Sequence, residues 1–231
     1  MKILSPVRFR GNTFPHPPRA VRPETFLPFV FLAVFLVIGG LAVVTSLKQQ
    51  RKAREQLAGL ARRFGLELLR QKAKLGFEPP PTVAGRYRSR PVRFFNYPTG
   101  SGKSRTTWSA VTAAVGGAGG LTLELFPENF LTRIGTALGM QDIRVGDPAF
   151  DQAFMIKSND PAYAAAALLP EIRARLLTER QRGARGHLTI KNGEVRYAEM
   201  GEFDNEARVT RLAEMLEPAC DLAEVAEVYT A

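Results

Sequence analysis

Residues Phe26 to Leu47 read FLPFVFLAVFLVIGGLAVVTSL, and these 22 residues contain no charged side chain. Fifteen of them are Leu, Ile, Val or Phe. Because a helix rises about 1.5 Å per residue, the run is long enough to cross the roughly 30 Å of hydrocarbon in a bilayer. Each of these residues favours insertion by roughly 0.3–0.6 kcal/mol near the bilayer centre. The sequence therefore predicts a transmembrane helix over residues 26–47.

Two other kinds of segment can be apolar over a comparable length. A secretory signal has a short basic start, an apolar run of roughly 7–15 residues and a small-residue cleavage site. Here 25 residues precede the run, and the segment VVTSLKQQ at its end offers no good cleavage site. A buried core helix normally keeps a polar face, which this run lacks. We therefore expect a permanent, single-pass anchor in the cell membrane.

The net charge of +10 is unevenly distributed along the chain. Residues 1–123 hold 20 Lys and Arg against 4 acidic residues, whereas residues 124–231 hold 12 against 18. Six basic residues follow the apolar run up to Arg63 and five precede it, a slight bias towards a cytoplasmic C-terminal side. The single cysteine, Cys220, excludes an intrachain disulfide and suits a reducing compartment. These features favour a cytoplasmic location for the soluble part.

The composition divides the chain into four parts. Residues 1–25 hold five prolines among scattered basic residues and predict a disordered tail. The predicted membrane helix (26–47) comes next. Residues 48–81 predict a helical stalk and linker, with an apolar stripe at helical spacing that ends before Gly65 and a stop at EPPP. Residues 82–231 are predicted to form the folded domain.

The first half of this domain is rich in strand signals. Alternating residues from Val83 to Phe94 flank the turn-like RSRP and predict a hairpin. The runs RTTWSAVTAAV and LTLELF predict further antiparallel strands, joined by the glycine loop GGAGG. A short helix is predicted from Pro127 to Leu138.

The second half predicts helices around a hairpin. Asp147-Pro148 and Asp160-Pro161 each suit an N-cap followed by proline, and FMIKS between them predicts a strand. The segment 161–181 predicts a helix that restarts at Pro170. LTIKNGEVRY predicts a hairpin with a type I′ turn at Asn192-Gly193. Helices are expected from Asn205 to Tyr229 with a break at Pro218, so the fold class is α+β, an antiparallel sheet with flanking helices.

The segments DIRVGDPAFDQAFMIKSNDPAYAAAALLPEIRARLL and HLTIKNGEVRYAEM, with an acidic terminal helix, resemble a bacterial family of membrane-associated proteins that carry a domain of unknown function. The resemblance covers about residues 82–229. It implies a membrane-linked α+β architecture and no particular activity. Similar members often have two membrane spans, whereas one is predicted here.

Several residues are of types that occur in phosphate-binding, catalytic or metal sites, but their patterns favour structural roles. GSGKS (100–104) ends like a phosphate-binding loop, yet Tyr97 replaces the required first glycine and a strand-like run follows instead of a helix. His187 and Cys220 have no recognisable catalytic partner. The four acids Asp142, Asp147, Asp151 and Asp160 lack the spacing of a calcium loop. We expect no metal, no cofactor and no enzymatic activity.

The strongest remaining feature is a stretch of 45 residues, Pro79 to Leu123, without an acid. On a strand, Arg86, Arg88 and Arg90 would point to one face and leave Tyr87 to the core. We predict a basic patch that faces anionic lipid headgroups; its members are Arg86, Arg88, Arg90, Arg93, Lys103 and Arg105. A plain solvated surface and nucleic-acid binding are the alternatives, and the latter is disfavoured because no RNA-binding signature is present.

The leading hypothesis is a membrane-anchored, non-enzymatic interaction or scaffold module, with its basic face towards anionic lipid and its acidic helices available to a protein partner. The alternative is an enzyme or small-ligand-binding domain whose site forms only in three dimensions. A deep polar pocket that brings Asp142, Asp147 and His187 together would favour this alternative.

Overall fold

The computed structural model describes residues 27–69, 80–117, 120–127 and 142–230. The chain divides into two compact units, and the boundary lies between Ser46 and Leu47. The predicted tail (1–25) and the predicted helix Pro127 to Leu138 lie outside the described residues, apart from Pro127 itself.

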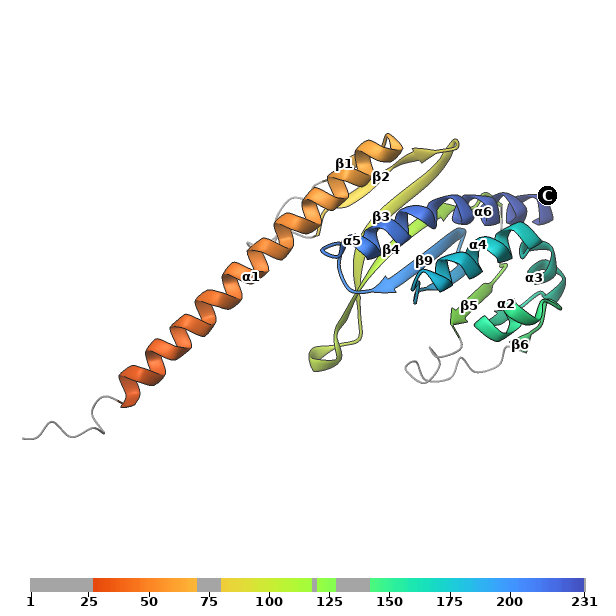
Figure 1. Cartoon of the computed structure of the whole chain (residues 1–231). Coiled ribbons are helices and arrows are strands. Elements are labelled where there is room, and N and C mark those ends of the chain that lie inside the picture. The colour runs from red at the N-terminus through yellow and green to blue at the C-terminus, as the bar shows by residue number, and fades with distance from the viewer. Residues whose placement is uncertain (1–26, 70–79, 118–119, 128–141, 231) are drawn as a thin grey trace, which may run out of the picture. The chain divides into compact units, whose positions relative to one another are not determined.

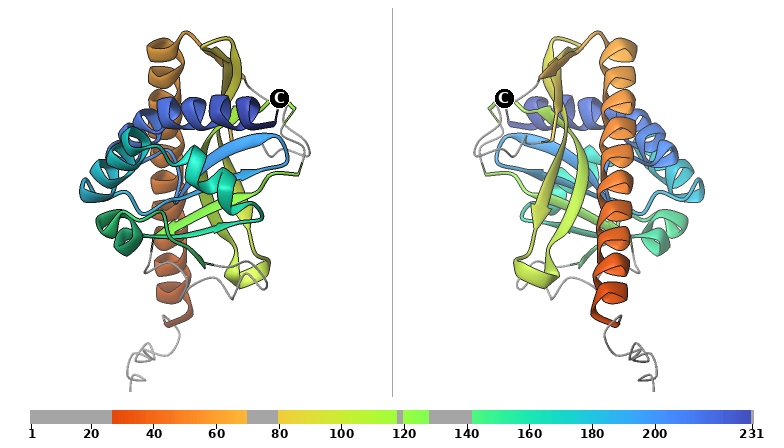
Figure 2. Two further views of the ribbon diagram at one scale, coloured as in Figure 1. Left: turned by 90° about the vertical axis from the view of Figure 1, so that its right-hand side faces the viewer. Right: turned by 90° about the vertical axis from the view of Figure 1, so that its left-hand side faces the viewer.

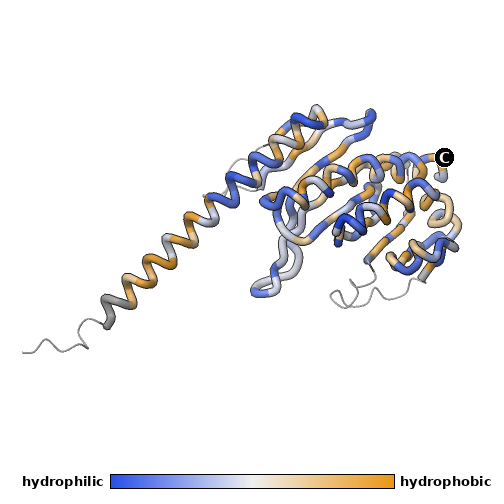
Figure 3. Tube along the Cα trace, in the orientation of Figure 1, coloured by the Kyte–Doolittle hydropathy of each residue, from blue (hydrophilic) through white to orange (hydrophobic). Residues whose placement is uncertain are grey.

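The described part of the first unit is the N-terminal portion of helix α1 (Leu27–Phe64). From Phe31 onwards its apolar side chains are exposed; Phe35, for example, is 75% exposed. Figure 3 shows this portion as a hydrophobic stretch. Among the described residues, this helix is the one long and apolar enough to cross a membrane, and none of its apolar window is buried. A core helix would instead be mostly buried. The exposure of this helix therefore agrees with the sequence analysis, which argued against a core helix.

The second unit is built on one antiparallel sheet (Figure 1). Its described strands lie in the order β1-β2-β3-β4-β9-β8-β5-β7-β6. Neighbouring strands in this order pair antiparallel, as the fold-class prediction requires. The strands are β1 (Glu67–Leu69), β2 (Thr82–Tyr87), β3 (Arg90–Thr99), β4 (Thr106–Ala114), β5 (Leu123–Pro127), β6 (Asp142–Ile143), β7 (Phe154–Ser158), β8 (His187–Lys191) and β9 (Glu194–Met200).

The described helices of this unit pack on one face of the sheet (Figure 2). They are the end of α1, α2 (Pro148–Ala153), α3 (Pro161–Ala167), α4 (Pro170–Gln181), α5 (Glu206–Glu214) and α6 (Leu216–Thr230). Alternating strand residues such as Val92 and Phe94 meet this layer and are 1% and 0% exposed. The main hydrophobic core therefore lies between the sheet and the helices, as expected for a sheet covered on one side.

The end of α1 belongs to this core. Leu57 is fully buried and Leu60 is 4% exposed, both in the same cluster as Val83 and Phe94. After Gly65, whose φ of 64° ends the helix, β1 extends the sheet beside β2. The structure thus differs from the predicted boundary at residue 82, because the apolar stripe assigned to a stalk packs against the sheet and the second unit starts at Leu47.

The local turn and cap signals are confirmed. Lys191 pairs with Glu194, and Asn192 and Gly193 have φ of 54° and 73°, as a type I′ turn requires. The side chains of Asp147 and Asp160 accept hydrogen bonds from backbone N–H groups in the first turns of α2 and α3. A further helix starts at Pro170, as predicted.

The sequence predicted a break in the C-terminal helices at Pro218, but the structure has the break at Met215. Pro218 instead occupies the first turn of α6. There its missing N–H group costs nothing, because the first N–H groups of a helix have no intrahelical acceptor.

Candidate functional site

The predicted alignment of Arg86, Arg88 and Arg90 on one strand face is wrong. Strand β2 ends at Tyr87, and Arg88 and Ser89 form the turn to β3 with φ of 51° and 62°. The turn reverses the chain, so the simple alternation of a strand does not continue through these positions. Arg86 remains exposed and donates a hydrogen bond to the carbonyl oxygen of Ser89.

Arg88 and Arg90 bind the acidic edge of α6. Arg88 donates to Asp221 at 2.6 Å and lies 3.0 Å from Glu224. Arg90, whose side chain is 9% exposed, donates two hydrogen bonds to the carboxylate of Glu227, at 2.6 and 2.9 Å. The hydrogen bond from Arg90 holds the pKa of Glu227 below its ordinary value. These two arginines therefore neutralise acids within the domain, and those acids are not free for a partner.

Arg93 lies on the other face of the sheet, which carries no helix among the described residues. Its guanidinium donates to Glu194 at 3.0 Å and lies 5.1 Å from the ring centroid of Phe95. Arg196 also pairs with Glu194 and lies 5.4 Å from the ring of Tyr97. Cation–π contacts at such distances are favourable by roughly 0.5–1 kcal/mol where exposed. This cluster joins β3 to β9 across β4.

Lys103 and Arg105 lie at the tip of the β3–β4 hairpin, and both are exposed. In the part of the chain that the structure describes, neither has an ion-pair partner. The structure therefore separates the six predicted residues into three groups: the turn, the helix-free face and this tip. It does not bring them together as one patch.

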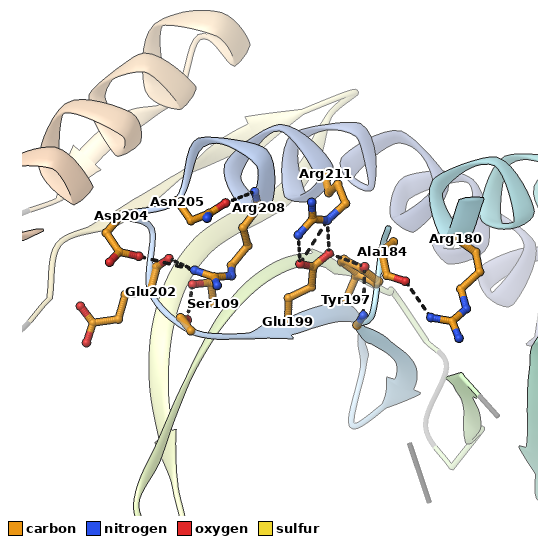
Figure 4. Close-up of polar contacts among 12 residues, drawn as sticks. Ser109, Arg180, Ala184, Tyr197, Glu199, Glu202, Asp204, Asn205, Arg208 and Arg211 are labelled. Atoms are coloured by element: carbon orange, nitrogen blue, oxygen red, sulfur yellow. Dashed lines mark hydrogen bonds and ion pairs between the residues drawn. The ribbon is translucent and has the colours of Figure 1, made fainter. Parts of the chain in front are cut away.

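A buried polar network lies between β9 and α5 (Figure 4). Glu199 is 4% exposed and accepts hydrogen bonds from Nε and Nη2 of Arg211, at 2.9 and 2.7 Å. Its Oε1 also accepts a hydrogen bond from the Tyr197 hydroxyl at 2.7 Å. Burial and the Glu199 carboxylate raise the pKa of Tyr197 well above its ordinary value, so this hydroxyl stays protonated. The network holds a buried charge pair with its donors satisfied, and it ties α5 to the sheet.

Gly186, which precedes β8, allows the backbone to lie close to Tyr197 of this network. Its N–H group donates to the Tyr197 hydroxyl at 3.3 Å. A Cβ at Gly186 would lie 2.5 Å from the Tyr197 ring and 2.5 Å from the carbonyl oxygen of Ala198. Only glycine fits here without displacement. Sequence reasoning missed this network; the charged residue Glu199 in an apolar, alternating strand was the available signal.

A second part of the network continues into the loop before α5. Arg208 donates to the carbonyl oxygen of Glu202 at 2.5 Å, and the Asn205 side chain caps the helix at the Arg208 N–H group. The Ser109 hydroxyl lies 2.7 Å from the carbonyl oxygen of Gly201. Figure 4 shows these contacts beside those of Glu199. They order a loop and leave no open polar site.

The predicted acids are dispersed. Asp142 lies opposite Lys157 in the backbone register of β6 and β7, and Asp147 caps α2. Asp151 accepts hydrogen bonds from the backbone N–H groups of Val145 and Gly146. Within the described ranges, no group of three His, Cys, Asp or Glu side chains is placed to hold a metal ion.

His187 stands apart from these acids, because β8 and β6 are separated by β5 and β7. It packs edge-on against Trp108, with ring centroids 5.1 Å apart, on the helix-free face. Burial, and secondly the charge of Arg196, lower the pKa of His187 to about 4. Cys220 is fully buried in α6, and burial raises its pKa to about 11. Both groups are therefore neutral at pH 7.

GSGKS forms the hairpin tip and is followed by β4, as expected from the sequence. A phosphate-binding loop must open onto a helix N-terminus, and this one does not.

The described part of the second unit contains a small, partly open space of about 20 Å³ under α4, lined by apolar side chains together with Glu179, Arg180 and Tyr197. It has room for about one water molecule. An open groove of about 290 Å³ lies between α4 and the start of α6 and is lined by Ala174, Arg175, Thr178, Glu179, Arg182, Glu214, Glu217 and Pro218.

No family model and no curated protein matches this chain. A solved structure with a similar fold is the crystal structure of the mycobacterial trehalose monomycolate transport factor A, TtfA. The similarity covers 77% of this chain and 96% of that chain, with a TM-score of 0.53 and 11% sequence identity. At this identity the similarity concerns the fold.

Proposed function

We propose that this protein is a membrane-anchored interaction module that acts without catalysis. The observation that carries the proposal is the exposure of the apolar portion of α1. A soluble protein would leave side chains such as Phe31, Phe35 and Val37 in water at 68%, 75% and 69% exposure. At about 25 cal/mol per Å² of apolar surface, transfer of such a helix into lipid is strongly favourable. The apolar run supports a single membrane span, and the slight excess of basic residues after it supports a cytoplasmic second unit.

The second unit supports a binding role and not a catalytic one. Its large side chains, such as Phe94, Phe150 and Tyr163, are fully buried, so the core is filled. The residues that would have favoured an enzyme, Asp142, Asp147 and His187, lie on separate elements. The buried Glu199–Arg211 pair has its hydrogen bonds satisfied within the fold, which favours a structural role.

Contact with anionic lipid belongs to this proposal, but with fewer residues than the sequence predicted. Of the six predicted cations, Arg88 and Arg90 are engaged by α6, and Arg93 is engaged by Glu194. Arg86, which donates to the carbonyl oxygen of Ser89 but is exposed, and the tip residues Lys103 and Arg105 remain for external anions. Each Lys or Arg near an anionic surface contributes about 1 kcal/mol.

The groove beside α4 favours a second candidate function, the binding of a small polar ligand. Arg175 and Glu217 lie 3.2 Å apart at its wall, and their side chains are 51% and 50% exposed. Both charged groups can therefore reorient towards a zwitterionic molecule. Thermal-shift measurements with zwitterionic metabolites test this candidate, and loss of any shift in Arg175→Ala is expected if the groove is used.

The anchor is tested by alkaline carbonate extraction of membranes that contain the full chain. We expect the full chain to stay in the membrane pellet, and a C-terminal reporter to be active on the cytoplasmic side. A variant with Phe31, Phe35 and Val37 each changed to Asp should move to the soluble fraction. Release of the unchanged chain by carbonate would overturn the anchor, and a reporter active outside the cytoplasm would overturn the orientation.

A further inference from the structure

The β3–β4 hairpin projects beyond its neighbours as a two-stranded arm (Figures 1 and 2). Strand β2 pairs with β3 only as far as Phe94, and β9 pairs with β4 only as far as Trp108. The last residue pairs of the hairpin, Pro98 with Thr107 and Thr99 with Thr106, lie outside the pairing of both neighbouring strands. We call residues 98–107 the arm.

The end of the arm is a defined turn. Residues Gly102–Ser104 form one 3₁₀ turn, and the Trp108 ring nitrogen donates to the Thr99 hydroxyl at 2.8 Å near the base of the arm. Gly100 has φ of 75°, and a Cβ there would lie 2.5 Å from the carbonyl oxygen of Ser104. The backbone therefore presents the tip side chains in a set conformation, which lowers the entropy that binding would cost.

The charge of the arm is positive, and within the described ranges neither of its cations forms an ion pair. Its ten residues, PTGSGKSRTT, hold two cations, five hydroxyl groups and no acid. Ser101, Lys103, Ser104 and Arg105 are all exposed. A guanidinium binds phosphate oxygens in a bidentate manner, an ammonium acts as a point charge, and serine hydroxyls donate hydrogen bonds. This set of donors fits a phosphate group.

Within the second unit, the arm points towards the end at which α1 enters. Phe64 stacks on Phe94, with ring centroids 5.8 Å apart. Leu47 lies 17 residues before Phe64, which is about 26 Å along a helix. Thr99, the last residue of β3, lies 5 residues beyond Phe94, which is about 17 Å along an extended strand, and the turn at the tip follows it. Figure 2 shows the arm running alongside this part of α1 in the opposite chain direction. The arm therefore extends from Phe94 towards the level of Leu47.

Leu47 is also the last residue of the apolar run, where the helix leaves the hydrocarbon if the proposed anchor holds. We infer that the tip of the arm binds the phosphate groups of anionic phospholipids at the surface of the membrane that holds α1, through Lys103 and Arg105. This inference rests on the proposed function. It gives the anchor a second contact, which limits rotation of the second unit about α1.

A single introduced thiol can report on this contact. Cys220 is fully buried, and burial raises its pKa to about 11, so it reacts slowly with thiol reagents at neutral pH. Ser101 is exposed and lies between the two glycines of the tip. The full-length Ser101→Cys chain is labelled with an environment-sensitive fluorophore and placed in nanodiscs. Protection of the label from acrylamide, a neutral quencher, measures the docked fraction.

In discs that contain phosphatidylglycerol we expect a protected label, and in discs of phosphatidylcholine alone an accessible one. Lys103→Ser with Arg105→Ser should lower the ratio of docked to undocked tip about 30-fold, because each cation contributes about a factor of five. The matched control is Lys191→Ser with Arg185→Ser. It removes two exposed cations outside the arm. Lys191 lies opposite Glu194 in the backbone register, at the end of the sheet away from the arm. This variant should leave protection unchanged.

Four results would overturn the inference. Equal accessibility in both kinds of disc excludes headgroup binding, whereas equal protection in both excludes a role for the charge. Loss of protection on addition of inorganic phosphate at constant ionic strength assigns the tip to a free anion. Protection by single-stranded RNA in neutral discs assigns it to nucleic acid. Carbonate extraction separates the two proposals, since a chain that resists extraction but shows an accessible tip retains the anchor and loses only this contact.

Discussion

Arg90 on β3 and Glu227 on α6 are separated by 137 residues and joined by two hydrogen bonds of 2.6 and 2.9 Å. Arg90 also donates to the carbonyl oxygen of Ala114 at 2.6 Å, and Glu227 also accepts from the N–H group of Gly116 at 2.6 Å. The pair thus fastens the last helix to the ends of two strands. A cation expected at a lipid surface is instead part of the packing between the C-terminal helix and the sheet.

Replacement of Arg90 by Ala should lower the free energy of unfolding by about 2–3 kcal/mol. The change removes a nearly buried, charge-assisted interaction and leaves the carbonyl oxygen of Ala114 without this donor. Denaturant unfolding of the full chain in detergent measures it, with the fluorescence of Trp108, the single tryptophan, as the probe. Arg86→Ala is the control and should stay within about 0.5 kcal/mol of the wild type. A loss below 0.5 kcal/mol for Arg90→Ala would show that the pair contributes little.

Arg211→Met should destabilise the domain by about 3–5 kcal/mol, because it leaves the carboxylate of Glu199 buried without its cation. The double variant Glu199→Gln with Arg211→Met should recover most of this loss, since a neutral amide still accepts the hydrogen bond from Tyr197. The same unfolding measurement applies. If the double variant is as unstable as Arg211→Met, the side chain of Arg211 matters for its packing and not for its charge.

Local chemistry made much of this fold predictable. The Asn192-Gly193 turn, the two Asp-Pro caps and the restart at Pro170 each depend on residues within a few positions of one another, so the sequence alone contains the cause. The strand order has no such local cause. Strand β5 lies between β7 and β8, and no local pattern specifies these neighbours.

The candidate site was harder to predict for the same reason. Alternation suggested one face for Arg86, Arg88 and Arg90, but a turn at Arg88 and Ser89 interrupts it. The acids that engage Arg88 and Arg90 are more than 130 residues away. In α1, the stripe of Leu57 and Leu60 was recognised as a helix face, but a stripe does not identify the surface that covers it. Only the assembled sheet supplies that surface.

Cys220 should be almost inert to thiol reagents in the folded protein. A pKa of about 11 leaves roughly one thiol in a thousand ionised at pH 8, and the side chain is fully buried. Reaction with a chromogenic disulfide reagent should therefore be at least about 100-fold slower than in denaturant, where the pKa returns towards its ordinary value. Rapid labelling of the native chain would show that α6 detaches readily from the sheet.

The stability of the domain should fall as the pH is lowered from 7 to 5, and His187 should cause much of this fall. Burial lowers the pKa of His187 from 6.5 to about 4, so between these values the unfolded chain binds a proton that the folded chain does not. The unfolded state is therefore favoured as the pH falls through this window, by up to about 2 kcal/mol at pH 5. Glu227 and Asp160, whose pKa values are also lowered, contribute a loss below the ordinary carboxyl range, so the interval from 7 to 5 isolates the histidine.

Denaturant unfolding at pH 7, 6 and 5 measures this dependence. His187→Gln, which is neutral throughout, should give a nearly flat profile over this interval. His16→Gln, the matched change at the other histidine of the chain, should keep the slope of the wild type, because His16 belongs to the tail that the sequence predicts to be disordered. A wild-type profile that is flat from pH 7 to 5 would mean that His187 accepts a proton in the folded state. In that case the packing of His187 against Trp108 opens to water near neutral pH.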